Sequence, residues 1–353
     1  MAEITIMGAG AFGLSIAFLC AKAGAKVRVL EKDHIGAGSS GGLVGALAPH
    51  TPERWNSKKQ FQFESLVMAE PFWREVEEIS NEATGYGRIG RLQPINTERM
   101  LELAHERAEF AKDHWRGKAE WRVVSAAEFG EWAPKSETGL LVHDTLSARM
   151  HPRLATRALA SSIQKLGGEI TLGQDTPPAN AKTVIWATGA AGLEALSSEF
   201  DAPIGGGEKG QAALLGLSIE GKPQLYANSI HVIPHANGTT AIGSTTERDF
   251  NDASETDELL DDLLAKTRET FPVLANAPVI ERWAGARPRS QKRAPIVGRY
   301  PGRDGQFIAN GGFKIGFGMA PKLAQCMSEL VLEGRDAIPD EFKPERSIPS
   351  ASA

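Results

Sequence analysis

Hydrophobic residues follow two different periodicities along this 353-residue chain. Apolar positions spaced three and four residues apart predict helices, whereas short uninterrupted apolar runs predict the buried strands of a parallel sheet. The predicted helices span 14–23, 61–78, 98–113, 153–165, 256–270 and 320–332. The predicted buried strands span 4–7, 27–30, 183–187 and 307–309, and three of them run into glycines: Gly8, Gly189 and the pair Gly311-Gly312.

A third pattern consists of short apolar segments separated by Gly, Pro or Asn. These segments are 211–217, 224–227, 230–234 and 239–242. Segments this short and this close together predict an antiparallel sheet. We therefore expect an α/β fold. A Rossmann-like domain would be built from the separated segments 1–85, 146–203 and 285–353. A second domain, a mainly antiparallel sheet with helices, would be inserted as 86–145 and 204–284.

The first strand leads directly into Gly8-x-Gly10-x-x-Gly13, and an apolar helix follows at once. Gly8 permits a tight turn, Gly10 lets the backbone approach a pyrophosphate, and Gly13 lets the helix pack close to the strand. The N-terminus of that helix offers free N–H groups and a positive dipole end to phosphates. Glu31 ends the second strand 18 residues after Gly13, where a dinucleotide fold places the acid that binds the adenosine ribose. The alternative for Glu31 is a solvated strand end. As a ribose ligand it would disfavour the 2′-phosphate of NADP.

Composition narrows the class of protein further. The net charge of −5 comes with no basic run, so nucleic-acid binding is not expected. Cys20 and Cys326 each lie in an apolar helical segment, which indicates buried thiols in a reducing compartment and no metal or disulfide pair. No apolar stretch reaches the length of a membrane span, and the N-terminus lacks a basic leader. We expect a soluble cytoplasmic protein and leave open whether it forms a homo-oligomer.

Three further segments carry candidate chemistry. The glycine-dense run 36–50 is typical of backbone lying against a flat or phosphorylated ligand, with a flexible hinge as the alternative. Arg287 follows two small residues and precedes Pro288, so its backbone is constrained. A guanidinium held in place suits a carboxylate because it donates two parallel hydrogen bonds, although Arg287 could also be a surface arginine. The segment 308–321 repeats the strand–glycine–helix pattern near the C-terminus.

These segments, in this order, resemble the FAD-dependent D-amino-acid oxidase family, in particular its glycine oxidase and sarcosine oxidase-like members. The resemblance extends from residue 4 to about residue 334. The blocks 283–298 and 311–316 are more specific than the N-terminal glycine motif. The resemblance implies that the first domain binds FAD and the inserted domain binds substrate. FAD would be held noncovalently, because no cysteine lies where sarcosine oxidase relatives attach it.

The resemblance also implies which residues hold FAD. The ADP half would contact Gly8, Gly10, Gly13 and Glu31. Near the adenosine, the cofactor would also be lined by Thr188 and Gly189. Along the pyrophosphate and flavin ring it would contact Ser39, Ser40, Gly45, Ala46 and Leu47. At the pyrimidine end of the flavin it would contact Gly312, Phe313, Lys314, Ile315, Gly316 and Gly318. Many relatives carry a strand hairpin where this chain has the short segment 171–182, so the adenine contacts stay open.

Around the substrate, the resemblance assigns Arg287 to the carboxylate. His231 stands where glycine oxidase has a tyrosine, and Lys314 where it has a second arginine. The basic run 291–293 replaces an acid common in relatives. These departures favour an anionic substrate and leave open whether it is glycine. His50 would lie at the flavin face or be a structural histidine.

The expected function is oxidation of the amine of an amino acid or N-substituted glycine, by hydride transfer to flavin N5. Oxygen or another acceptor would reoxidise the flavin. One alternative is a flavin module acting on a carboxymethylaminomethyl group of a tRNA wobble uridine, although the partner methyltransferase domain is absent and the charge is mildly negative. Another is a flavoprotein subunit without activity of its own.

Overall fold

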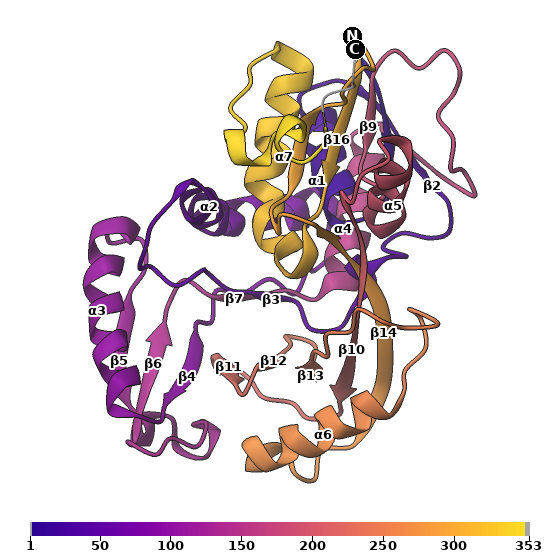
Figure 1. The fold of residues 1–353 in the computed structure, drawn as a ribbon. Helices are drawn as coiled ribbons and strands as arrows, with labels where there is room; N and C mark the ends of the chain where they lie inside the picture. Colours follow the sequence, from indigo (N-terminus) through magenta and orange to yellow (C-terminus); the bar gives the residue numbers. More distant parts are fainter. Residues whose placement is uncertain (1, 350–353) are drawn as a thin grey trace.

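The computed structural model describes residues 2–349, and two large sheets dominate this part of the chain (Figure 1). The first sheet has six strands in the order β15-β16-β9-β1-β2-β8, all parallel to their neighbours except β15. Its strands are β1 (Glu3–Met7), β2 (Lys26–Glu31), β8 (Glu169–Leu172), β9 (Val184–Trp186), β15 (Ile296–Arg299) and β16 (Gln306–Asn310).

Helices cover both faces of this sheet, which is why its central strands are uninterrupted apolar runs. On one face, Ile185 and Phe307 join a core formed with the helices α1 (Ala11–Lys22), α2 (Ser57–Ser80), α4 (Pro152–Lys165) and α7 (Gly316–Glu333). On the other face, Trp186 and Ile308 pack with Leu193 of α5 (Gly189–Glu199). Alternate residues of β9 and β16 therefore serve two separate cores.

The second sheet has eight strands in the order β14-β10-β13-β12-β11-β4-β6-β5. Neighbours are antiparallel except β4 and β11. The strands are β4 (Arg91–Ile95), β5 (Trp121–Ser125), β6 (Leu140–Asp144), β10 (Gly205–Leu215), β11 (Gln224–Ala227), β12 (Ile230–Pro234), β13 (Thr240–Gly243) and β14 (Val279–Ser290). Helix α3 (Glu98–Trp115) packs on β5, and a small sheet pairs β3 (Ala46–Leu47) with β7 (Ala148–Arg149).

The two faces of the eight-stranded sheet differ in character. One is apolar and packs against Leu260 and Leu264 of α6 (Glu258–Thr270), which lies across the sheet at the bottom of Figure 1. The other, which we call the site face, carries the side chains of a register row across five strands. This row is Trp283, Ala212, Gly243, His231 and Tyr226. Arg287 shares the site face because it lies four residues from Trp283 on β14.

The segment that precedes β3 covers the centre of the site face. A Cβ on Gly243 would lie 2.6 Å from the Cγ2 of Val44, so the glycine makes room for that side chain. Leu43, Ala212 and Ile233 pack in the same small core. The glycine-rich run of the first domain is therefore packed directly on the sheet of the second.

The predicted α/β fold, with a Rossmann-like sheet from separated segments and a mainly antiparallel second sheet, is confirmed. Several predicted boundaries were wrong. Helices α1 and α7 begin earlier than expected, at 11 and 316, and α6 begins later, at 258. Helix α5 and strands β4, β5, β6 and β8 were not predicted. Residues 282–289 do not follow the second sheet; they belong to its edge strand β14, so the expected boundary at 284/285 falls inside a strand.

Between residues 2 and 349, none of the helices combines the length and the apolar character that crossing a membrane requires.

Candidate functional site

A cavity of about 730 Å³ opens at the carboxyl ends of the central strands of the six-stranded sheet. Its wall includes Gly8 after β1, Glu31 at the end of β2, Ala187 after β9 and Asn310 at the end of β16. The carboxyl edge of such a sheet is where open α/β folds bind ligands. The cavity reaches the second sheet as well, because Gly285 of β14 lines it.

The residues predicted to hold FAD divide into two groups. Those on the cavity wall are Gly8, Gly10, Glu31, Ser39, Ser40, Thr188, Gly189, Gly312, Phe313 and Gly316. Those outside the wall are Gly13, Gly45, Ala46, Leu47, Lys314, Ile315 and Gly318. Two of these glycines have packing roles: a Cβ on Gly13 would overlap the Gly8 carbonyl oxygen, and one on Gly45 would overlap that of Met150.

Three helices begin at this wall, and none has a capping side chain at its N-cap residue. The N-caps are Gly10 for α1, Thr188 for α5 and Ile315 for α7. One of the freed N–H groups, on Ala11, donates to Ser40 Oγ at 2.9 Å. Uncapped helix N-termini present N–H donors and positive potential, the arrangement that binds phosphates.

The wall is also bare of side chains where a long ligand would lie. A Cβ built on Gly38, Gly189 or Gly316 would find no atom within 4 Å. Glu31 closes one end of the cavity and accepts hydrogen bonds from the backbone N–H groups of Ala9 (2.8 Å) and Asp33 (3.0 Å). Each carboxylate oxygen keeps a lone pair for a ribose hydroxyl. This bare, donor-rich cavity with an acid at one end fits the ADP half of FAD.

The short segment 171–182 reaches the same end of the cavity. Gln174 and Asp175 line the wall near Glu31, and the Gln174 N–H donates to the Glu31 carbonyl oxygen at 3.0 Å. The loss of the hairpin therefore still leaves protein atoms beside the ribose acid.

Arg287 lies on the site face, is 8% exposed, and has no carboxylate within ion-pair distance among residues 2–349. Oxygen atoms hold its guanidinium instead. Nη1 donates to Ser244 Oγ at 2.7 Å, and Nη2 donates to the carbonyl oxygens of Lys209 (3.0 Å) and Thr245 (2.7 Å). The ring of Phe313, on the cavity wall, lies 5.7 Å from its Cζ. Burial lowers the pKa of Arg287, and the nearby Glu208 and Glu247 partly offset that effect.

The carboxylate role of Arg287 stays a prediction, and the contacts of its guanidinium bear on how many hydrogen bonds it could donate to a ligand. A guanidinium binds a carboxylate with two parallel hydrogen bonds either through Nε and Nη2 or through Nη1 and Nη2, so both arrangements need Nη2. In Arg287, both N–H groups of Nη2 already donate to backbone oxygens. The donors that remain are Nε–H, which is buried without a partner in the described chain, and one N–H of Nη1. A substrate carboxylate would receive one hydrogen bond from Arg287 and its second from another residue.

Lys314 and His231 are the other two residues predicted to bind the substrate. Lys314 Nζ donates to Thr246 Oγ1 at 2.6 Å, and burial together with the charge of Arg287 lowers its pKa. Burial, reinforced by the charges of Arg91 and Lys314, lowers the pKa of His231 to about 3. The His231 ring is therefore neutral at physiological pH rather than titrating there, and its buried Nδ1 has no partner in the described part of the chain.

His50 is placed away from these residues. Its backbone N–H donates to the Oε1 of Gln62 at 2.7 Å, and its ring Nδ1 makes a short contact with the same oxygen. Gln62 is a buried residue of α2 and donates to the Ala48 carbonyl oxygen. Burial lowers the pKa of His50. These contacts give His50 a clear structural role, and a role at the flavin remains a prediction.

Two groups of residues on the eight-stranded sheet were missed by sequence reasoning. Tyr226 packs on His231 with ring centroids 4.5 Å apart, and the Arg91 guanidinium lies 5.6 Å from its centroid. The Tyr226 hydroxyl makes no hydrogen bond to residues 2–349. The second group surrounds the buried cation of Lys209. Tyr226 could have been noticed because it lies in the predicted strand segment 224–227. No sequence pattern identifies a lysine that is buried in a strand.

Comparisons with known proteins identify the family of this chain. A model of the family described as FAD dependent oxidoreductase matches residues 3–330. Glycine oxidase from Pseudomonas aeruginosa is 26% identical over 370 residues, covering 96% of this chain and 96% of that protein. The crystal structure of glycine oxidase from Geobacillus kaustophilus has a TM-score of 0.83 at 19% identity, covering 97% of this chain and 98% of its own. That of iminodiacetate oxidase from Chelativorans sp. BNC1 has a TM-score of 0.84 at 22% identity, with the same coverage.

Proposed function

The chain belongs to the FAD-dependent oxidoreductase family and is an FAD-dependent amine oxidoreductase of the glycine oxidase type, and we propose that it oxidises an amino acid or N-substituted glycine whose carboxylate binds Arg287. The observation that carries this proposal is the state of Arg287. It is a buried cation without an acidic partner in the described chain, and it stands on the strand whose neighbouring residues 284–286 line the cavity. A buried charge of this kind is stabilised by an anionic ligand.

The donors left on the site face support two-residue recognition of the carboxylate. Arg287 supplies one hydrogen bond, from Nε or Nη1. The second comes from Lys314, whose pKa is lowered by burial and by the charge of Arg287. Lys314 adds a positive charge beside Arg287, and a lysine serves here as a point charge without the planar fork of an arginine. Together these groups favour a substrate with pronounced negative charge.

The residues of the site position the substrate rather than exchange protons with it. When bound, FAD would supply the two-electron acceptor for the hydride lost from the substrate α-carbon. The amine enters uncharged, so its lone pair assists the loss of hydride, and the nitrogen proton leaves to water. The neutral His231 does not protonate the product. The resulting imino acid hydrolyses to an oxo acid and an amine. Positioning of this kind accounts for catalysis without a general base.

Replacing Arg287 with Ala tests the carboxylate role directly. A hydrogen bond to a charged group contributes about 1.5–3 kcal/mol, so kcat/KM for a carboxylated amine is expected to fall about 10–150-fold. FAD stays bound, because Arg287 itself is not on the wall of the cavity. Steady-state kinetics and flavin absorbance provide the measurement.

Arg299→Ala, which removes an exposed arginine from β15, is the matched control and leaves kcat/KM within about twofold. If Arg287→Ala retains flavin and turns over carboxylated amines at the wild-type rate, the carboxylate role of Arg287 is wrong.

The identity of the amine is best approached by anaerobic bleaching of the flavin. The panel comprises glycine, sarcosine, proline, D-amino acids, iminodiacetate and other N-carboxymethyl amines, with methylamine as the uncarboxylated control. At least one carboxylated amine should bleach the flavin and methylamine should not. This readout separates substrate choice from the identity of the electron acceptor.

A further inference from the structure

The position of Arg287 depends on a four-residue segment that follows β13. Ser244 supplies the hydroxyl oxygen that accepts from Nη1, and Thr245 supplies a carbonyl oxygen that accepts from Nη2. The next residue, Thr246, accepts from Lys314. Residues 244–247 therefore contact both unpaired cations of the candidate substrate site.

The same segment is attached to β10 by its other side. Lys209 and Glu247 exchange both backbone hydrogen bonds, at 2.9 and 3.0 Å. The Thr245 N–H donates to the Gln211 carbonyl oxygen, and its hydroxyl accepts from the Gln211 N–H. Side chains thus alternate along the segment: Ser244 and Thr246 face the site, whereas Thr245 and Glu247 face away from it.

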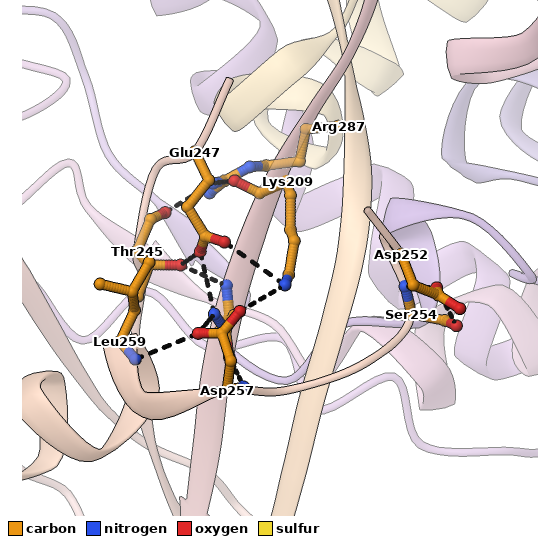
Figure 2. A network of polar contacts seen from close by, with 9 residues as sticks. Lys209, Thr245, Glu247, Asp252, Ser254, Asp257, Leu259 and Arg287 are labelled. Carbon is orange, nitrogen blue, oxygen red and sulfur yellow. Dashed lines mark hydrogen bonds and ion pairs between the residues drawn. The ribbon is translucent and has the colours of Figure 1, made fainter. Parts of the chain in front are cut away.

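On the side away from the site lies a closed set of polar contacts among Lys209, Gln211, Glu247 and Asp257, which we call the Lys209 cluster. Lys209 Nζ lies 2.7 Å from Asp257 Oδ2 and 3.4 Å from Glu247 Oε2. Gln211 Nε2 donates to the other oxygen of each carboxylate, at 2.6 Å for Asp257 and 3.1 Å for Glu247. Figure 2 shows the charged ends of Lys209, Glu247 and Asp257 directed toward one another.

Burial makes Lys209 important to this arrangement. The lysine is 3% exposed and Glu247 is 9% exposed. Burial alone would lower the pKa of Lys209, but the hydrogen bond to Asp257 and the charges of both carboxylates raise it. Without the ammonium group, Glu247 would be a buried carboxylate without its cation. A buried unpaired charge is costly, so the Glu247 side chain would move toward solvent. Movement of Glu247 would displace residues 244–246 with it.

The cluster also holds both ends of the loop 248–256. Glu247 stands immediately before this loop, and Asp257 stands immediately after it as the N-cap of α6, accepting from the Leu259 N–H at 3.0 Å. Within the loop, Ala253 and Ser254 line the cofactor cavity. One buried lysine therefore contacts the two anchor points of a loop that borders the cofactor.

We propose that Lys209 is a positioning residue for catalysis. Through the Lys209 cluster it holds residues 244–247 in the arrangement that presents Arg287 and Lys314 to the substrate carboxylate. The inference rests on the proposed function, because it takes Arg287 to be the carboxylate ligand. It adds a residue that does not touch substrate and an element, the segment 244–247, through which that residue acts.

The test is Lys209→Met in the FAD-loaded enzyme. KM for a carboxylated amine, and Kd for acetate measured by perturbation of the flavin spectrum, should both rise by about tenfold or more. The limiting rate of flavin reduction should change by less than about threefold, because a bound substrate still meets the same flavin. Arg282→Met is the matched control, since it breaks the exposed Arg282–Asp261 pair between the same strand layer and α6. It should leave both constants within about twofold.

A double-mutant cycle distinguishes positioning from general destabilisation. In an Arg287→Ala background, Lys209→Met should raise KM by a clearly smaller factor than in the wild-type background, because only Lys314 remains to be positioned. An equal rise in both backgrounds would overturn the proposal. If Arg287→Ala itself has no effect, the proposed function fails. If only Lys209→Met has no effect, this inference alone fails.

Should Lys209→Met fold poorly, the charge-balanced variant Lys209→Met/Glu247→Gln removes the buried acid together with its cation. A smaller rise in KM than in the single variant is expected, because the unpaired buried charge is gone while the contacts of Lys209 with residue 247 and Asp257 are still lost. The loss in Tm should also be smaller. An unchanged KM in this variant would show that the cluster is structural only and overturn the proposal.

Discussion

Gly210 has no side chain at the one position of β10 over which the Arg287 guanidinium lies. A Cβ there would come within 3.0 Å of Cζ, Nη1 and Nη2. The guanidinium cannot move aside without losing its bonds to the carbonyl oxygens of Lys209 and Thr245. Gly210 has no positive φ, so its backbone conformation does not require glycine. The Arg287 guanidinium requires it, because a Cβ would occupy the same space.

We predict that Gly210→Ala raises KM for a carboxylated amine by about tenfold or more while FAD stays bound. Gly206→Ala, on the same strand with its nearest neighbour 3.6 Å from the added Cβ, is the control and should keep the wild-type KM. Steady-state kinetics on both variants measure the difference. A wild-type KM for Gly210→Ala would mean that Arg287 need not occupy the place described here.

The low pKa of His231 predicts how the stability of the fold changes in acid. Its pKa is about 3 in the folded protein and about 6.5 when exposed. Because the folded value is the lower one, the unfolded chain binds the extra proton, and stability is full above about pH 6.5 and declines as the pH falls toward 3. His231→Gln should flatten this decline, as measured by urea unfolding from about pH 4.5 to about pH 7.5. Exposed His105→Gln serves as the control, and an unaltered slope in His231→Gln would contradict the burial argument.

At the scale of elements, strongly periodic or uninterrupted apolar segments were predictable and the edge strand of the site was not. The central strands of the six-stranded sheet are buried on both faces, so an apolar run identifies them. Strand β14 contains Pro288 and several small residues, which argue against a strand. It tolerates them because it lies at the edge of its sheet, where a proline need not donate to a neighbour. Strand β14 lacks alternating apolar residues because the side chains on one of its faces belong to the candidate site and are not packed in a core.

The candidate site shows the same division. The motif Gly8-x-Gly10-x-x-Gly13 and Glu31 could be assigned roles because each role is local to one strand–turn–helix unit. The Lys209 cluster could not, because Glu247 and Asp257 are brought to Lys209 by long-range pairing with β10. For the same reason, the residues around position 287 could not indicate that Arg287 Nη2 donates to two backbone oxygens, because these oxygens belong to Lys209 and Thr245.

At the scale of the whole molecule, the cofactor cavity is shared by segments from both layers. Its wall combines Gly8 and Asn310 of the six-stranded sheet, Gly285 of β14 and Ser254 of the loop before α6. A ligand that contacts all of these binds the folded state only. Free energy from FAD binding should therefore add to the stability of the entire fold.

Removal of FAD should lower the free energy of unfolding by about 2.7 kcal/mol relative to protein with free FAD at 100 times its Kd. Titrating FAD into the apoprotein should raise Tm steadily with the logarithm of FAD concentration, as followed by calorimetry. ADP, which matches only the glycine-motif end of the cavity, is the control and should give a smaller rise. A Tm independent of FAD would contradict a cavity built across both layers.

The assembly of the six-stranded sheet from distant segments has a consequence for synthesis of the protein. Strand β9 lies between β1 and β16, and these two strands are separated by about 300 residues of chain. At about 5–20 residues per second, roughly 15–60 s pass between the emergence of the first strand and that of the last. Because Ile308, Asn310 and Phe313 form part of the cavity wall, a nascent chain has no complete binding site for FAD until these residues have been translated. The cofactor therefore cannot act as a template for the folding of the segments that precede them.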